Sequence, residues 1–386
     1  MNILFVTLTP LEYNESVTKS NYNILCGLIQ LGHNVTILMP ALQKCSISYD
    51  DAYQLHNIKE VLRIVNTITI GHKIRTWIKS RKIIGKIYKK LLILDNTREY
   101  LLQFNSNIVD AQLSEYYDYV ISTSDPKTSH LYVRKLIESG LKYGKWIQHW
   151  GDPLSGDITR KEFYPKWVIR LVERNIMKHA DKIVYVSPFT KEMITEVHPT
   201  LADKISFVPL PSDECKEQPS PVEQKMQGNL ELAYLGDYTS KVRNIMPLYN
   251  ACNKMNDVNL SIVGYSDLQL KSNGNIKIYP RLPQNEANVF RDRADVSVCV
   301  CNLRGTQIPG KIYYDASTNK HLLVIVDGDN KEDLITYLKQ FDRFIVCYND
   351  EQSISDAIIQ IRKKQNTQYS TPIELLPKTV AMHILQ

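Results

Sequence analysis

Two cationic residues in the second half of the chain have neighbours that suit the binding of a phosphate group. Arg243 follows an apolar run that ends in Leu235-Gly236 and stands where a helical pattern begins. Its guanidinium fork and the helix N-terminus could therefore meet phosphate oxygens. Lys311 comes directly after Pro309-Gly310, where a compact ammonium group could reach the same phosphate. A cation exposed to water is the alternative interpretation of each residue.

A histidine and an aspartate lie close together in the first half of the chain. His149 ends an apolar run of strand length, and Asp152 stands between Gly151 and Pro153. Imidazole can donate or accept a hydrogen bond near neutral pH, which suits a residue that holds a substrate. The alternatives are a structural histidine and an aspartate that serves the turn before proline.

The common phosphate-binding loops are missing from the sequence. It contains no G-x-x-x-x-G-K-[ST] and no G-x-G-x-x-G after a strand. Asp327-Gly328-Asp329 could bind a divalent metal through two carboxylates, but an aspartate between a strand and a helix more often caps exposed amides. We favour the capping interpretation and expect no metal site.

The elements that must position these residues alternate between strand and helix, which predicts an α/β fold with parallel sheets. Expected strands are Ile3–Thr7, Val35–Met39, Tyr119–Ser122, Trp146–His149, Lys182–Ser187, Glu231–Leu235, Asn259–Val263, Ile276–Tyr279, Val296–Val300, Leu322–Val326 and Phe344–Cys347. Helical periods occupy Ser20–Leu31, Asn285–Arg293 and Glu332–Gln340. We expect two doubly wound, Rossmann-like domains, with the site in the cleft between them.

Proline clusters mark the expected domain boundary. Residues 1–208 form the first predicted domain, and 209–229 form a linker with four prolines. Residues 230–365 form the second domain. A C-terminal segment, 366–386, could return to the first.

Composition agrees with a two-domain globular protein. The chain has 386 residues, of which 43% are hydrophobic and 23% charged. No apolar run approaches the ~18 residues needed to span a bilayer. The first 16 residues resemble a core strand rather than a signal peptide. Seven scattered cysteines predict neither a disulfide framework nor a paired metal site. We therefore expect a cytoplasmic protein.

One segment carries the excess positive charge. Residues 72–91 contain eight Lys and Arg and no acidic residue, whereas the net charge of the whole chain is only +6. On a helical wheel, six of these cations share an arc of roughly 100°: Arg75, Lys79, Lys82, Lys86, Lys89 and Lys90. The pattern predicts a helix lying on an anionic membrane surface. A helix that packs on the first domain is the alternative, and nucleic acid is not an expected partner.

Several motifs, taken in order, resemble those of family 4 glycosyltransferases of the polysaccharide-assembly type. In the first half the resemblance lies in Thr123-Ser124-Asp125-Pro126 with His130, in Trp146–Pro153, and in the segment from Val172-Glu173-Arg174 to Ser187. In the second half it lies in Leu235-Gly236-Asp237, in Gly264 and in Ile308–Lys320.

The resemblance implies the GT-B fold and a retaining transferase that uses a nucleotide-diphosphate sugar, with no cofactor and no metal. The implied catalytic residues are His149, which would contact the transferred sugar, and Asp152. The implied donor-binding residues are Gly236, Arg243, Gly264, Gln307, Lys311, Tyr314 and Asp315. The sequence departs from the family's Glu-x7-Glu pair: Gln307 replaces the first Glu, and Asp315 replaces the second or is shifted by one residue from Tyr314. We favour Asp315 as the ribose ligand. Asp237 stands where many relatives have a phosphate-binding Arg.

These features predict transfer of a sugar, from a UDP-sugar by preference, to a lipid-linked oligosaccharide. The expected context is bacterial O-antigen or capsule synthesis by a peripheral protein at the inner face of the plasma membrane. Two alternatives remain: a degenerate GT-B protein that binds a glycan or a partner, and a sugar-nucleotide epimerase.

Overall fold

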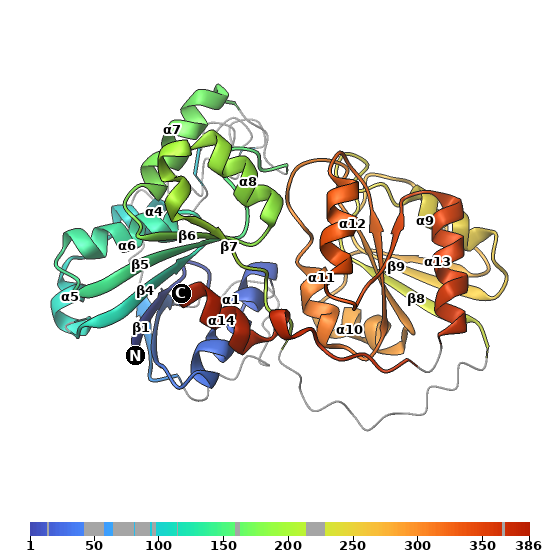
Figure 1. Ribbon diagram of the computed structural model, residues 1–386, viewed down its shortest axis with the longest axis horizontal. Coiled ribbons are helices and arrows are strands. Elements are labelled where there is room, and N and C mark those ends of the chain that lie inside the picture. The colour runs from blue at the N-terminus through green and yellow to red at the C-terminus, as the bar shows by residue number, and fades with distance from the viewer. Residues whose placement is uncertain are drawn as a thin grey trace. The chain divides into compact units, whose positions relative to one another are not determined.

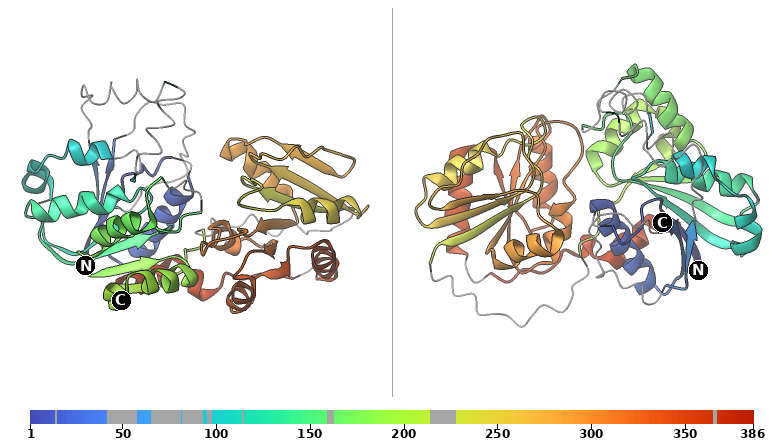
Figure 2. Two further views of the ribbon diagram at one scale, coloured as in Figure 1. Left: turned by 90° about the horizontal axis from the view of Figure 1, so that it is seen from above. Right: turned by 180° about the vertical axis from the view of Figure 1, so that it is seen from behind.

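The structure is a computed structural model that describes residues 1–13, 15–41, 58–64, 81, 93–94, 98–113, 115–158, 163–213, 228–364 and 367–386. The chain divides into two compact units. The first comprises Met1–Pro209 and Val380–Gln386, and the second comprises Leu210–Thr379. In each unit, helices cover both faces of one sheet (Figures 1 and 2).

The first unit contains a seven-stranded parallel sheet in the order β3-β2-β1-β4-β5-β6-β7. Its strands are β1 (Asn2–Val6), β2 (Asn34–Pro40), β3 (Glu60–Ile64), β4 (Tyr117–Thr123), β5 (Tyr143–Trp150), β6 (Lys182–Tyr185) and β7 (Ile205–Phe207). The direction of strand addition reverses between β1 and β4. Open parallel sheets bind ligands beyond the carboxyl ends of their strands at such a reversal.

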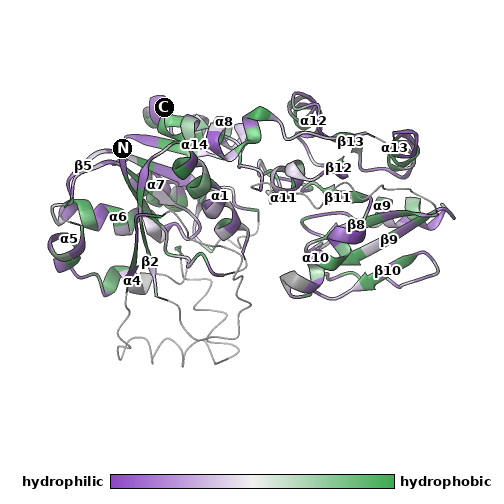
Figure 3. Ribbon diagram, turned by 90° about the horizontal axis from the view of Figure 1, so that it is seen from below, coloured by the Kyte–Doolittle hydropathy of each residue, from purple (hydrophilic) through white to green (hydrophobic). Residues whose placement is uncertain are grey.

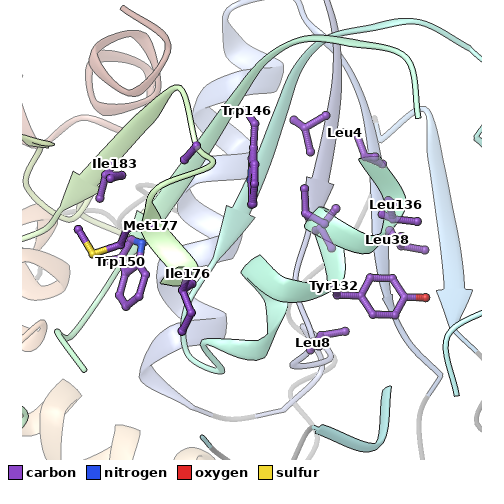
Figure 4. Packing of buried hydrophobic residues seen from close by; sticks show 14 of the residues in the cluster. Leu4, Leu8, Leu38, Tyr132, Leu136, Trp146, Trp150, Ile176, Met177 and Ile183 are labelled. Carbon is purple, nitrogen blue, oxygen red and sulfur yellow. The ribbon is translucent and has the colours of Figure 1, made fainter. Parts of the chain in front are cut away.

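Alternating side chains of these strands supply two cores, one on each face of the sheet. On one face, Trp146 and Trp150 pack with Met177 and other apolar residues (Figure 4). This face is covered by α4 (Arg98–Leu102), α5 (Asn107–Gln112), α6 (Thr128–Glu138), α7 (Lys166–Met177) and α8 (Pro188–Val197), and η1 (Pro199–Lys204) follows α8. On the other face, Ile3 and Phe5 pack with α1 (Ser16–Gln30) and α14 (Pro377–Leu385).

A lysine fixes the end of α14 to the first unit. Lys182 Nζ donates to the carbonyl oxygens of His383 and Ile384 at 2.9 and 3.0 Å. Carbonyl groups in the last turn of a helix lack intrahelical donors, so a cation there satisfies them. The last residues of the chain therefore belong to the first unit.

The second unit contains a six-stranded parallel sheet in the order β10-β9-β8-β11-β12-β13, which reverses between β8 and β11. Its strands are β8 (Leu230–Leu235), β9 (Val258–Val263), β10 (Ile276–Tyr279), β11 (Val296–Val300), β12 (His321–Val326) and β13 (Ile345–Tyr348). Its helices are α9 (Met246–Asn253), α10 (Gln284–Arg293), α11 (Lys311–Tyr314), η2 (Asp315–Ser317), α12 (Lys331–Lys339), α13 (Glu351–Lys363) and η3 (Ile373–Leu375). Apolar residues of α9 and α13 meet the strands in one core, and Figure 3 shows the hydropathy along each element.

The predicted α/β class is confirmed, and β10 and β11 have the predicted bounds. Two strands were not predicted, β3 and β7, which form the two edges of the first sheet. The predicted basic helix at 72–91 lies outside the described residues except for Arg81. Among the described helices, none is both long and apolar enough to cross a membrane.

Candidate active site

The second sheet places two cations at its topological reversal. Arg243 Nε donates to Asn302 Oδ1 at 3.1 Å, and an Arg243 Nη atom donates to the Asp237 carbonyl oxygen at 3.2 Å. Asp237 follows β8 and Asn302 follows β11, so the guanidinium joins the carboxyl ends of the two strands where the order reverses. Arg243 is therefore held at the position where this type of sheet binds ligands.

The local structure around Arg243 differs from the prediction in one respect. The helix α9 begins at Met246, so Arg243 does not lie inside its first turn. It lies instead in a turn in which the amides of Val242 and Arg243 both donate to the Thr239 carbonyl oxygen at 2.9 Å. Pro247, near the start of α9, fixes the helix entrance because it needs no amide partner there.

Lys311 reaches the same strand end. Its Nζ lies 3.5 Å from the carbonyl oxygen of Leu235, the last residue of β8, and 3.8 Å from Asp315 Oδ2. Lys311 opens the short helix α11, and Asp315 follows one turn later, which brings the two side chains together. The ammonium group is thus held near the end of β8.

The position of Asp315 argues against the predicted ribose contact. Its side chain is only 4% exposed, and its Oδ2 accepts a hydrogen bond from Ser297 Oγ on β11 at 2.7 Å. The carboxylate is therefore already engaged by a hydroxyl group of the sheet and lies beside the Lys311 ammonium group. The contacts of Asp315 instead suit a residue that positions Lys311.

The other four predicted donor-binding residues, Gly236, Gly264, Gln307 and Tyr314, also lie near the carboxyl ends of these strands. Gly264 follows β9 and lies so close to Gly236 that a Cβ atom on Gly264 would be 2.1 Å from the Gly236 carbonyl oxygen. Gly236 has φ of +145°, a conformation that other residues rarely adopt. The backbone carbonyl of Gln307 accepts from Asn302 Nδ2 at 3.0 Å. Tyr314 is buried, and its ring packs against Gly310.

An ion pair at this edge was not predicted. The carboxylate of Asp237 pairs with Arg281, which follows β10, and also accepts from the amide of Tyr265 at 2.9 Å. Burial would raise the pKa of Asp237, but these hydrogen bonds outweigh it and lower the pKa. Arg281 thus places a guanidinium beside Asp237 at the carboxyl ends of β8 and β10. No local motif marks this pairing, because the two residues are 44 positions apart.

The Asp327-Gly328-Asp329 segment neither caps a helix nor gathers metal ligands in the described structure. Asp327 Oδ1 accepts from the amide of Gly328 at 2.8 Å, and its Oδ2 accepts from Asn349 Nδ2 at 2.5 Å. The residue that precedes α12 is Asn330. Over the described part of the chain, no group of three or more His, Cys, Asp or Glu residues could hold a metal ion.

In the first unit, His149 lies at the carboxyl end of β5 beside Thr123 of β4, its partner in the strand register. The imidazole is 2% exposed, and neither ring nitrogen has a hydrogen-bond partner among the described residues. Burial lowers the pKa of His149 to about 4. A neutral imidazole is left with one donor and one acceptor to offer to a ligand or a water molecule.

Asp152 lies just beyond His149 in a cluster of charged residues. Burial, with the charge of Asp125 as a smaller cause, raises the pKa of Asp152 to about 6 against the opposing charge of Lys127. Lys127 Nζ is 2.6 Å from Asp125 Oδ1. Burial would lower the pKa of Lys127, but the charge of Asp125 outweighs it and the pKa is raised. Asp152 is therefore poised to change its protonation near neutral pH.

A buried network supports the strand that carries His149. Trp146 Nε1 donates to Ser122 Oγ at 2.9 Å, and the same hydroxyl lies 2.8 Å from His130 Nδ1. The His130 ring stacks on Trp150 with the ring centres 4.7 Å apart. His130, which the motif comparison singled out, therefore stiffens the end of β5 from the adjacent helix α6.

Glu173 on α7 holds the turn that follows Asp152. Its fully buried carboxylate accepts from the amides of Leu154 and Ser155 at 2.6 and 3.0 Å, from the Ser155 hydroxyl, and pairs with His198 Nε2 at 3.0 Å. The sequence marked Glu173 only as part of a motif. The helical pattern places Glu173 on the apolar face of α7. That position could have indicated a buried structural carboxylate, because a carboxylate in a hydrophobic core needs several hydrogen-bond partners.

One cavity of the second unit lies away from these residues. It has a volume of about 240 Å³ and is lined by Glu231, Asn259, Lys277, Phe290 and Arg293, among others. Glu231 and Asn259 stand at the amino ends of β8 and β9, opposite the edge that carries Arg243. We therefore do not assign the donor site to this cavity.

Comparison with solved structures identifies the architecture. The structure of Anabaena Alr3699/HepE in complex with UDP and glucose matches with a TM-score of 0.55 and 10% identity, over 99% of this chain and 95% of that chain. A glycosyltransferase from Rickettsia africae ESF-5 matches with a TM-score of 0.54 and 14% identity, over 99% and 93%. This chain has the GT-B fold. The sucrose-phosphate synthase of Thermosynechococcus elongatus shares it, with a TM-score of 0.50 and 12% identity, over 100% and 94%. No protein-family model and no curated protein matches the sequence.

Proposed function

We propose that this GT-B protein is a glycosyltransferase that uses a nucleotide-diphosphate sugar, with a UDP-sugar favoured. The observation that carries the proposal is the placement of Arg243 and Lys311 at the β8–β11 reversal. A departing nucleoside diphosphate gains negative charge, and two cations held at that position would stabilise it. The structures of HepE with UDP and with UDP-glucose support this donor class.

The proposed reaction breaks the bond between the sugar's anomeric carbon and the diphosphate oxygen and forms a bond to an acceptor hydroxyl. Arg243 and Lys311 bind the diphosphate, and Asp315 positions Lys311. His149 hydrogen-bonds the transferred sugar, since its neutral imidazole has one N–H donor and one acceptor nitrogen available. Asp152, with a pKa of about 6, accepts a proton or a hydrogen bond from a hydroxyl group. Neither a metal ion nor a cofactor has a step in this scheme, and retention of configuration is proposed from the family resemblance.

The acceptor in this proposal is a lipid-linked oligosaccharide of bacterial surface polysaccharide synthesis, such as O-antigen or capsule. Its support is the resemblance to polysaccharide-assembly enzymes and the basic segment 72–91, with six cations in one helical arc. The protein would then act as a peripheral protein at the inner face of the plasma membrane.

One observation favours a second candidate, a degenerate GT-B protein that binds a glycan or partner. The residues that stand near the family's second Glu, Tyr314 and Asp315, are both buried. A protein that had lost its ribose ligand could keep the fold and lose turnover.

The test is an assay of purified protein with bacterial membrane lipids and labelled UDP-, GDP- and dTDP-sugars. We expect hydrolysis or transfer from one donor, and its loss in Arg243→Gln. An absence of turnover with every donor would contradict the proposed activity. Retained nucleotide binding without turnover would favour the degenerate protein.

A further inference from the structure

A row of large apolar side chains stands exposed along α7. Trp167 is 64% exposed and Leu171 is 55% exposed, and Phe163, just before the helix, is 60% exposed. Trp167 and Leu171 are four residues apart, so they lie on the same side of the helix, and Phe163 precedes the first helical turn. Single exposed apolar residues are common, but three so close together in the chain need an explanation.

Four cations lie along the same side of α7. Lys166, Arg170, Arg174 and Lys178 are all exposed, and none forms an ion pair with another described residue. On a helical wheel, five exposed residues fall within an arc of about 100°: Trp167, Arg170, Leu171, Arg174 and Lys178. We call these five residues, together with Phe163 and Lys166, the α7 ridge.

The opposite side of α7 already provides the contacts that hold it. Ile169, Ile176 and Met177 enter the core of the first unit, and Glu173 is the buried carboxylate that binds Ser155 and His198. Glu173 is the only acid between Lys166 and Lys178, and it is fully buried. The α7 ridge is therefore positive and apolar and contains no acidic residue, and the core contacts of the helix come from its other side.

We propose that the α7 ridge docks the protein on an anionic lipid surface. A helix lying in a membrane interface places tryptophan and leucine among the acyl chains, while long cationic side chains reach the phosphate groups. The interleaving of both kinds of side chain in one arc matches that geometry, and the charge is complementary to acidic lipids. This proposal rests on the proposed function in one respect: a lipid-linked acceptor would give the protein a reason to bind a membrane. The residues of the α7 ridge are different from those of the basic segment 72–91.

The experiment measures flotation of the full chain with vesicles of phosphatidylcholine containing about one third phosphatidylglycerol, and with pure phosphatidylcholine. We expect binding to the anionic vesicles only. Trp167→Ser with Leu171→Ser should reduce the bound fraction about tenfold, and Arg170→Gln with Arg174→Gln and Lys178→Gln should do the same and weaken the salt dependence. The matched control is Ile359→Ser with Lys363→Gln, an exposed pair on α13, which should bind as the unmodified protein does.

Fluorescence gives a readout at the ridge itself. Trp146 and Trp150 are buried, so in a Trp77→Phe background a blue shift on addition of anionic vesicles reports Trp167. Unchanged thermal unfolding and UDP titration in each variant would show that the fold and the donor site remain intact. If no UDP binds but vesicle binding depends on the ridge, the donor proposal fails and this one stands.

Three results would overturn the proposal. One is binding that persists in both α7 variants but disappears in Lys79→Gln, Lys82→Gln, Lys86→Gln and Lys89→Gln together. Another is equal binding to neutral vesicles. The third is no binding to either vesicle, which would leave the ridge as a contact surface for another protein.

Discussion

Arg243 Nε and Asn302 Oδ1, 3.1 Å apart, connect the turn after β8 to the turn after β11. The two strands are neighbours in the sheet but are separated by 60 residues of chain, so this hydrogen bond ties their carboxyl ends together across the topological reversal. A planar guanidinium can make this bond through Nε and still present the N–H groups of its Nη atoms to a phosphate, whereas the N–H groups of an ammonium all radiate from one nitrogen and form no such fork.

Arg243→Lys should therefore weaken UDP binding by about tenfold or more, because a single ammonium nitrogen lacks the planar fork that can hold Asn302 through one nitrogen and bind a diphosphate through the others. Calorimetric titration with UDP measures the change, and thermal unfolding checks the fold. The matched control is Lys339→Gln, which removes an exposed cation at the end of α12. Equal UDP affinities for Arg243→Lys and the unmodified protein would exclude Arg243 from the site.

Asp315→Asn separates a positioning role from a ribose-binding role. The asparagine can keep a hydrogen bond with Ser297 but loses the charge that attracts Lys311 at 3.8 Å. We expect a moderate loss of UDP affinity, smaller than that of Lys311→Gln, and an unchanged ratio of UDP to 2′-deoxy-UDP affinity. A ratio that collapses toward one in the variant would restore Asp315 as the ribose ligand.

Gly264→Ala should destabilise the second unit by about 1–3 kcal/mol, because its methyl group would meet the Gly236 carbonyl oxygen and force the ends of β8 and β9 apart. Urea unfolding measures the loss, and UDP affinity should fall with it, since Gly236 lies at the proposed donor edge. Gly274→Ala is the matched control, because no atom lies within 4 Å of the Cβ position there. Similar unfolding midpoints for the two variants would contradict this account of the strand ends.

Asp152 should give the activity an acidic limb near pH 6. Transfer that needs its carboxylate rises as the pH passes its pKa of about 6 and is constant above it, whereas His149, with a pKa of about 4, adds no limb near pH 6.5. The pH profile of kcat/KM under subsaturating donor measures this. A limb that remains at pH 6 in Asp152→Asn would assign it to another group.

Asp152 should make the free energy of unfolding fall as the pH rises, whereas it makes the activity rise. An unfolded aspartate ionises near 3.8 and the folded one near 6, so unfolding releases a proton between these values and the free energy of unfolding falls as the pH rises. Above pH 6 the loss is complete. Asp152→Asn should therefore raise the free energy of unfolding of the first unit at pH 7, by roughly 2 kcal/mol, and by little at pH 4. A variant less stable than the unmodified protein at pH 7 would contradict the burial of an ionised Asp152.

The sequence predicted the central strands because they are buried on both faces and read as continuous apolar runs. It missed β3 and β7 because edge strands are short or carry charged residues such as Glu60 and Arg63, which weaken that signal. It identified Arg243, Lys311, His149 and Asp152 from motif order, and the structure holds the first two at one strand edge and the last two at another.

The residues that contact these side chains are far from them in the sequence. Asn302 is 59 positions from Arg243, and Arg281 is 44 positions from Asp237. No local pattern marks such pairs, because they exist only once parallel strands bring loop ends together. Asp315 shows a second limit: the motif that singled it out could not reveal its burial or its hydrogen bond from Ser297.

Calorimetric titration of the full chain with UDP, GDP and dTDP is the strictest test of the proposed donor site, with Arg243→Gln measured beside it. We expect one of these nucleotides to bind with one-to-one stoichiometry, and we expect Arg243→Gln to remove most of the affinity while the thermal unfolding midpoint is unchanged. Binding of none of the three, or binding of equal strength in Arg243→Gln, would contradict a donor site at the β8–β11 reversal.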